Sequence, residues 1–418
     1  MKKNHNKIDR RDFLKTIGAA GMGAVLSSCD AKAEPNDPNA TEKKQESVLP
    51  QVPKRQLGKS GIEIPCLSIG IMYNIIEKQI VLRKCLQHGI GFWDTAPAYA
   101  GGNSEAGIGK FLAKNPEVRK EVFLVTKASG ARTVNDVEKR LQTSLKRLNT
   151  AYIDLYHGVH ALTDPSQLTD ELKDWVKDAK KRKLIRLFAF TTHSNMAENL
   201  AAAAKLDWVD AIMTSYNFRL MQDSKMMDAI EACHKKGIGL IAMKTTGKTI
   251  VGWAQQNIET KEDKKLVDNF LKKGFSEVQA TIKLVLDDKR ISSACVGMEN
   301  VDFISSNVAA VLDKTKLTQV DFDVFKEYAK ATCSGYCAGC AHICDRALPD
   351  VPYVSDIMRY LMYYNTYGDK DRARELFARL PKDVKSKLLR TNYSVAEARC
   401  PQQLPIGKLV AEAVSKLA

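Results

Sequence analysis

The sequence predicts an α/β fold in which eight parallel strands close into a TIM (β/α)8 barrel surrounded by helices. Short apolar segments with the character of buried strands recur at residues 65–71, 90–94, 121–127, 151–156, 184–190, 209–215, 238–243 and 291–297. Segments between them, such as 134–148 and 170–184, place apolar residues at helical spacing and basic residues on the outer face. Eight alternations of strand and helix are enough to close a parallel sheet on itself.

Length and charge allow this barrel and additional segments. The chain has 418 residues, of which 44% are hydrophobic and 27% charged, as in ordinary globular proteins, and a barrel uses ~250 residues. The formal charge is +15, of which residues 1–28 supply six basic and two acidic side chains, leaving +15 − 4 = +11. Because no nucleic-acid motif accompanies the basic balance, we expect no nucleic-acid binding and favour a solvated or membrane-proximal surface.

The first 52 residues indicate where in the cell the protein is located. Residues 1–29 contain Arg10 and Arg11, then a short glycine-rich apolar run, then Cys29. This order resembles a twin-arginine export signal that ends in the lipobox of a bacterial lipoprotein. Residues 30–52 are polar and contain proline, which is typical of a flexible tether. We therefore expect an exported, extracytoplasmic protein that is held at a membrane by a lipid anchor.

Three groups suited to proton transfer follow the ends of the second and third predicted strands. Asp94 ends the second strand, Tyr99 follows it by five residues, and Lys127 ends the third. A cation near a phenol lowers the pKa of that phenol from ~10, which favours proton transfer near neutral pH. The trio resembles the signature of the aldo/keto reductases. Residues 55–72 also resemble the opening hairpin and first strand of that family.

The resemblance covers residues 53–315 and implies reversible reduction of a small carbonyl or sugar-like substrate. In the family's pattern a histidine stands five residues after the aspartate of the fourth strand. Here that aspartate is Asp154 and the slot holds Val159. A one-residue bulge would bring His160 into the site, so we predict Asp94, Tyr99, Lys127 and His160 as the catalytic set. His157 remains the alternative.

The same resemblance implies a nicotinamide cofactor, NADP or NAD. Tyr216 would stack on the nicotinamide ring, Thr192 and His193 would meet its carboxamide, and Lys244 would face the pyrophosphate. Phe303 stands where many NADP-dependent members carry an arginine, so the choice between NADP and NAD stays open. The predicted cofactor-binding residues are Gly70, Met72, Thr192, His193, Tyr216, Lys244, Gly297 and Asn307.

Residues 316–418 are predicted to form a small helical, cysteine-rich extension. The spacing of its first four cysteines resembles a ferredoxin-type motif, and a later cysteine precedes a proline. We expect one [4Fe-4S] cluster and a redox partner, with metal ligands among Cys333, Cys337, Cys340, Cys344 and Cys400. Cys400 could replace Cys344, or Cys337, Cys340 and Cys344 could be completed by Cys333 or Cys400. A disulfide is the alternative outside the cytoplasm.

Two features keep a second function open. The displaced histidine and the missing arginine would also suit an electron-transfer or binding lipoprotein on a non-catalytic barrel. The intact Asp94, Tyr99 and Lys127 favour the enzyme. Residues 250–276 are insertion-like and helical, and we predict that their charges form a solvated helix face.

Overall fold

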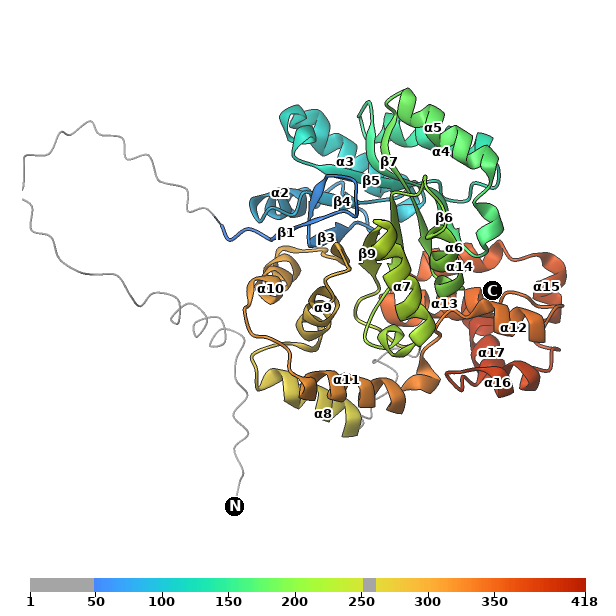
Figure 1. Cartoon of the computed structure of the whole chain (residues 1–418). Coiled ribbons are helices and arrows are strands. Elements are labelled where there is room, and N and C mark those ends of the chain that lie inside the picture. Colours follow the sequence, from blue (N-terminus) through green and yellow to red (C-terminus); the bar gives the residue numbers. More distant parts are fainter. Residues whose placement is uncertain (1–48, 251–260) are drawn as a thin grey trace, which may run out of the picture. The chain divides into compact units, whose positions relative to one another are not determined.

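The structure is a computed structural model that describes residues 49–250 and 261–418 (Figure 1). The predicted export signal and lipobox, and residues 30–48 of the predicted tether, lie outside the described residues. Residues 251–260 of the insertion lie outside them as well. Among the described helices, none combines the length and the apolar character needed to cross a bilayer.

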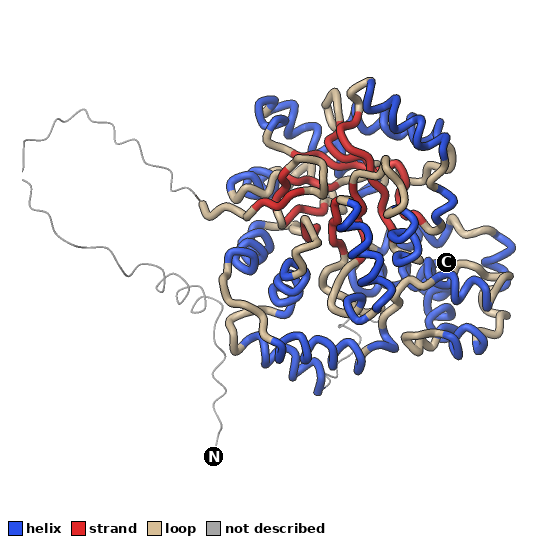
Figure 2. Tube along the Cα trace, viewed as in Figure 1, coloured by secondary structure: helices blue, strands red, loops and turns tan. Residues whose placement is uncertain are grey.

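Eight parallel strands form a closed barrel, as predicted. The barrel order is β10-β3-β4-β5-β6-β7-β8-β9, and each of the eight predicted segments overlaps one of these strands, although β6 and β7 run six and two residues beyond the predicted ends. Figure 2 shows the strands at the centre and helices around them. The strands are β3 Leu67–Gly70, β4 Phe92–Asp94, β5 Phe123–Lys127, β6 Ile153–Leu162, β7 Ile185–Thr192, β8 Ala211–Ser215, β9 Gly239–Met243 and β10 Ser293–Gly297.

An antiparallel hairpin closes the N-terminal end of the barrel. Its strands are β1 Lys54–Gln56 and β2 Glu63–Pro65. Leu57 and Ile64 are fully buried in the same apolar cluster as the inward-facing side chains of the barrel. The functional site is therefore expected at the C-terminal end of the barrel, which the hairpin does not cover.

Helices cover the outside of the sheet because each buries one apolar face on it. Helix α4 begins with a capping box between Thr133 and Asp136. The surrounding helices are α2 Ile80–Gln87, α3 Asn103–Lys114, α4 Val134–Arg147, α5 Asp170–Lys181, α6 Met196–Ala203, α7 Ser224–Lys236, α9 Glu277–Asp287 and α10 Val301–Leu312. Short 3-10 turns are η1 Tyr99–Gly102, η2 Pro116–Lys120, η3 Pro165–Gln167, η4 Leu220–Gln222 and η6 Cys333–Gly335.

The insertion contributes a helix that packs on a later one. Helix α8, Lys261–Leu271, buries Leu266 and Phe270 against α11, Gln319–Ala331. The ring centroids of Phe270 and Phe325 are 4.8 Å apart. The solvated face that we predicted for residues 250–276 is therefore only one side of this helix.

The C-terminal extension is helical, as predicted, and has its own apolar core. Figure 1 shows it in orange to red. Its elements are α12 Ala341–Ala347, α13 Val354–Met362, the π-helical turn η7 Tyr363–Tyr367, α14 Lys370–Ala378, α15 Lys382–Lys387, α16 Ser394–Arg399 and α17 Ile406–Leu417. Fully buried Ile357, Leu361 and Val410 join α13 to α17 in this core.

Candidate active site at the barrel mouth

A buried ion pair joins the ends of β4 and β5. The Nζ atom of Lys127 donates to both carboxylate oxygens of Asp94, at 2.6 and 2.7 Å, and to the Thr95 carbonyl at 2.8 Å. Burial opposes the charges of both partners and raises the pKa of Asp94. Burial alone would also lower the lysine pKa, but Asp94 and Tyr99 bring the pKa of Lys127 to about 12. The three oxygen acceptors hold the Lys127 ammonium in place between β4 and β5.

Tyr99 opens η1, directly after the turn that follows β4. The Nζ atom of Lys127 lies 4.8 Å from the centroid of the Tyr99 ring. Burial raises the pKa of Tyr99 to about 12, although Lys127 acts in the opposite direction. The expectation that the cation brings this pKa below its ordinary value is therefore wrong, because desolvation outweighs the lysine. Tyr99 carries its proton at neutral pH, as a proton donor must.

The fourth strand carries the irregularity that we predicted. The pairing of β6 with β7 shifts register between His157 and Val159 and again before Leu162, and Ala161 has a φ of 73°. The His160 ring consequently lies against the Tyr99 ring, with centroids 6.3 Å apart and an interplanar angle of 80°. Ser129 Oγ lies 2.7 Å from His160 Nδ1.

His157, the alternative, lies in a different environment. It pairs in register with Lys127 and is fully buried. Neither of its ring nitrogens has a hydrogen-bond partner in the described part of the chain, although the Phe190 backbone lies near the ring. Burial holds the pKa of His157 and of His160 well below the usual range, so both imidazoles are neutral. Geometry places His160, and not His157, in ring contact with the phenol.

The extension is attached to the ends of β7 and β8 by backbone and side-chain hydrogen bonds. The backbone N–H of Asn195 donates to the Gly339 carbonyl at 2.7 Å, and the backbone N–H of His342 donates to the side-chain Oδ1 of Asn195 at 2.9 Å. Asn217 donates to the Tyr336 hydroxyl at 3.1 Å. These bonds hold the extension over this part of the mouth.

A cavity lies between the barrel mouth and the extension. Its barrel wall includes His193, Ser215 and Lys244, from the ends of β7, β8 and β9. Its other wall comes from the extension and includes Tyr336 and Arg359. The predicted residues His193 and Lys244 thus meet here. The extension residues were not predicted, because no local pattern in the sequence relates them to the barrel.

Lys244 is the cationic end of the barrel wall. Its Nζ atom lies 5.3 Å from the centroid of the Tyr363 ring, and no ion pair is made by it among the described residues. Burial and the nearby Arg359 lower the pKa of Lys244 to about 7, while Cys337 acts in the opposite direction. The lysine therefore lies at the boundary between its charged and neutral forms near neutral pH.

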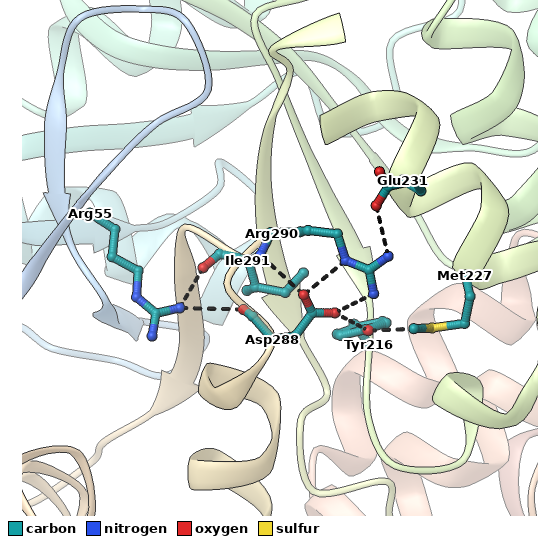
Figure 3. A network of polar contacts seen from close by, with 7 residues as sticks. All are labelled: Arg55, Tyr216, Met227, Glu231, Asp288, Arg290 and Ile291. Atoms are coloured by element: carbon teal, nitrogen blue, oxygen red, sulfur yellow. Dashed lines mark hydrogen bonds and ion pairs between the residues drawn. The ribbon is translucent and has the colours of Figure 1, made fainter. Parts of the chain in front are cut away.

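Tyr216 does not line the mouth, so its predicted stacking role is wrong. It is fully buried, and its hydroxyl donates to Asp288 at 2.6 Å (Figure 3). Arg290 holds the same carboxylate and also reaches Glu231. The physical reason is the alternation of side chains along an extended chain: Ser215 faces the mouth, and its neighbour faces the opposite way.

The hydroxyl of Thr192 also makes its hydrogen bonds inside the fold. Its Oγ1 lies 2.9 Å from the carbonyls of Leu162 and Ser194, and it accepts from Asn199 at 3.0 Å. With one proton and a full set of internal partners, this hydroxyl is not directed at a ligand. The predicted contact with a carboxamide is therefore left to His193.

The remaining predicted cofactor residues lie on the other side of the mouth or beyond it. Gly70 ends β3, with half-buried Met72 just after it, and Gly70 pairs in register with the exposed Gly297 of β10. Asn307 is buried on α10. Gly70, Met72 and Gly297 are thus at the same end of the barrel as Asp94.

Four of the five C-terminal cysteines are neighbours. Burial raises the pKa of Cys344, and the thiols of Cys337, Cys340 and Cys400 raise it further. Cys333 belongs to η6 and instead lies near Arg219. All the cysteines in the described ranges are free thiols. In the same ranges, no group of three or more His, Cys, Asp or Glu side chains is arranged to hold a metal ion.

The model of the Aldo/keto reductase family matches residues 73–330, which is more than half of the chain. The chain belongs to this family. It is accordingly an NAD(P)-dependent oxidoreductase. The match runs past the predicted boundary at residue 315 and ends before the cysteines, so the extension from Cys333 onward lies outside it.

Relatives cover the barrel at modest identity. L-galactose dehydrogenase of Arabidopsis thaliana is 26% identical over 292 residues, which cover 64% of this chain and 91% of that protein. L-glyceraldehyde 3-phosphate reductase of Escherichia coli K12 is 25% identical over 328 residues, or 65% and 92% of the two chains. A solved aldo-keto reductase from Bacillus halodurans shares the fold, with a TM-score of 0.54 and 21% identity over 67% of this chain and 97% of that one.

Proposed function

We propose that this aldo/keto reductase interconverts a small carbonyl compound and its alcohol, with Tyr99 as the proton donor. The main support for this proposal is the position of Lys127. Its Nζ atom donates to Asp94 and lies 4.8 Å from the centroid of the Tyr99 ring. An enclosed ammonium beside a phenol stabilises the negative charge that develops when the phenol gives up its proton. A barrel retained only as a scaffold would have no need of this costly arrangement.

Each residue then has one task. When bound, the nicotinamide cofactor supplies a hydride to the carbonyl carbon. Tyr99 gives its proton to the carbonyl oxygen, so that an alcohol forms, and Lys127 stabilises the tyrosinate that remains. Asp94 keeps Lys127 charged and in place. If the Ser129 hydroxyl donates to Nδ1, His160 keeps its proton on Nε2, from where it donates a hydrogen bond, and not the proton itself, to the same carbonyl oxygen and so orients the substrate.

The polar groups at the ends of β7 to β9 fit a nicotinamide dinucleotide. His193 Nδ1 lies 3.5 Å from Ser215 Oγ, and Lys244 comes directly after the next strand, β9. We propose that His193 and Ser215 meet the carboxamide and that the loop from Lys244 meets phosphate oxygens. Gly70, Met72, Gly297 and Asn307 would complete the cofactor site. Tyr216 and Thr192 have no part in it.

The substrate class that we propose is a polyhydroxylated carbonyl compound. Two relatives, L-galactose dehydrogenase and L-glyceraldehyde 3-phosphate reductase, are named for sugars or sugar phosphates. A sugar-like substrate is also in keeping with a mouth that offers hydroxyl, imidazole and ammonium groups.

The test is Tyr99→Phe, which keeps the ring and removes the proton. Turnover of short aldehydes and aldoses should fall ~10²-fold or more, the usual contribution of general acid catalysis. Cofactor binding, followed by fluorescence quenching, should be unchanged. Tyr152→Phe is the matched control, because that ring stacks on Arg119 before β6, away from the mouth. Wild-type turnover in Tyr99→Phe would overturn the proposal.

We further propose that the extension carries one [4Fe-4S] cluster, with Cys337, Cys340, Cys344 and Cys400 as its ligands. The spacing of the cysteines in the sequence supports a cluster, and the place of Cys333 in the separate turn η6 supports leaving it out of the ligand set. Anaerobically purified Cys340→Ala should lose iron and brown absorbance, whereas Cys333→Ala should keep both. Zinc or disulfides in place of iron would contradict the cluster.

Location is a separate proposal, which rests on the sequence of residues 1–29. We propose export by the twin-arginine route and acylation at Cys29. Stable anchoring needs more than one acyl chain, and a lipoprotein carries its acyl chains on the cysteine of the lipobox. Cys29→Ser should therefore abolish lipid labelling and release the protein from membranes. Replacing Arg10 and Arg11 with lysine should hold the protein in the cytoplasm. An unmodified Cys29 in the mature protein would remove the anchor.

A further inference from the structure

The cavity between the barrel mouth and the extension has two basic side chains and no carboxylate among its described lining residues. Lys244 comes from the end of β9 and Arg359 from α13, so each wall supplies one basic side chain. When both side chains are charged, they repel each other. Such an arrangement is stabilised when an anion lies between them.

The hydrogen-bonding capacity of these cations is not used up within the described residues. Arg359 donates from Nη2 to Asp356 at 2.5 Å, but its Nε is buried and has no partner. Lys244 makes no ion pair in the same part of the chain and faces the Tyr363 ring. A buried guanidinium N–H that lacks an acceptor is costly, so an acceptor from a ligand would be favourable.

Neutral donors lie beside the two charges. The Tyr336 hydroxyl accepts a hydrogen bond from Asn217 at 3.1 Å, which leaves its own proton free to donate. Ser215 and Ser355 add hydroxyl groups from opposite walls of the cavity. Cations together with hydroxyl donors are the groups that bind phosphate and carboxylate oxygens in proteins.

We propose that Lys244 and Arg359 form an oxyanion site, shared between barrel and extension, for a phosphate or carboxylate group. The proposal rests on the proposed function in one respect, since the ligand that brings this group is the substrate or the nicotinamide cofactor. The site makes the extension a part of the binding apparatus. Arg359 lies beyond the family match at residues 73–330, so the barrel alone lacks half of the site.

The experiment measures sulfate binding to the purified full-length protein by titration calorimetry, at constant ionic strength against chloride. Sulfate keeps its charge across the working pH range and needs no turnover. Arg359→Gln should weaken sulfate binding about tenfold or more, as expected for the loss of a charge-assisted hydrogen bond. Arg359→Lys should restore part of it. Arg379→Gln is the matched control, because Arg379 is an exposed arginine of the extension that pairs with Glu375.

A second arm identifies which ligand brings the anion. Sulfate binding that persists with saturating NADP⁺ assigns the site to the substrate's phosphate or carboxylate. Sulfate that NADP⁺ displaces, together with weaker NADP⁺ binding in Arg359→Gln, assigns it to the cofactor's phosphates. Wild-type protein that binds no sulfate, or Arg359→Gln that binds it as the wild type does, overturns the site. Neither result depends on carbonyl reduction, so loss of turnover in Tyr99→Phe leaves this test unaffected.

Discussion

The ring of His160 stands edge-on to the ring of Tyr99, with centroids 6.3 Å apart. This contact depends on the register shift in β6, which displaces the histidine by one place from the slot that Val159 occupies. His157, three residues earlier, is fully buried beside the same strand end and makes no such ring contact.

The two histidines should therefore respond differently to substitution. His160→Gln should lower kcat/KM for a carbonyl substrate about tenfold to a hundredfold, because the donor that orients the carbonyl oxygen is displaced. His157→Gln should change kcat/KM much less. Steady-state kinetics of both variants at one pH provides the comparison. The reverse order of effects would assign the orienting role to His157.

Removing the charge of Asp94 should destabilise the fold. Asp94→Asn leaves the Lys127 ammonium buried without a counter-ion, and breaking such a pair costs about 3–5 kcal/mol of unfolding free energy. The double variant Asp94→Asn with Lys127→Met should lose less unfolding free energy than the two single variants lose together, since no unpaired buried charge remains in it. Urea unfolding measures all three. Additive losses would show that the two side chains are not coupled.

The backbone contact between Gly339 and the barrel permits a test of how the extension is attached. Gly339 has a φ of 78°, and a Cβ there would lie 2.2 Å from the His193 carbonyl oxygen. Gly368 has a φ of 70° but open space around it. Gly368→Ala should cost only the conformational penalty of about 1–2 kcal/mol, whereas Gly339→Ala should cost more.

Hydrogen exchange gives the second readout for this pair. Gly339→Ala should also speed exchange at the end of β7 and in α12, because the alanine forces the two chains apart. Gly368→Ala should leave both regions as protected as in the wild type. Equal behaviour of the two variants would mean that the extension is not held at His193.

Glu138 should make stability depend on pH in acid. It accepts from both Nη atoms of Arg182 and from Trp175, and these bonds lower its pKa from 4.5 to about 2. Because the folded pKa lies below the unfolded one, the stabilisation is present above pH 4.5 and is lost as pH falls toward 2. Glu138→Gln should lower Tm at pH 6, and the difference from wild type should shrink below pH 4.5. Glu171→Gln, on the exposed start of α5, is the control.

The sequence allowed some residues of the site to be placed and not others. Asp94 and Lys127 were placed because each ends a strand, and all strands of a parallel barrel end at one face. Tyr216 was misplaced although the necessary signal was present. It follows Ser215, and adjacent side chains on a strand point to opposite sides, so only one of the two can face the mouth. The pKa of Tyr99 was misjudged because burial cannot be read from a motif.

The sequence by itself determined the order of the strands and helices and the presence of a helical extension. Those features follow from apolar periodicity, which acts over short stretches of chain, and from the count of eight alternating strands and helices, which is typical of a closed parallel barrel. Only the tertiary structure decided that the extension lies over the mouth and brings Arg359 into one cavity with Lys244. That contact depends on how two separately packed apolar cores dock, and packing of this kind leaves no periodic trace in the sequence.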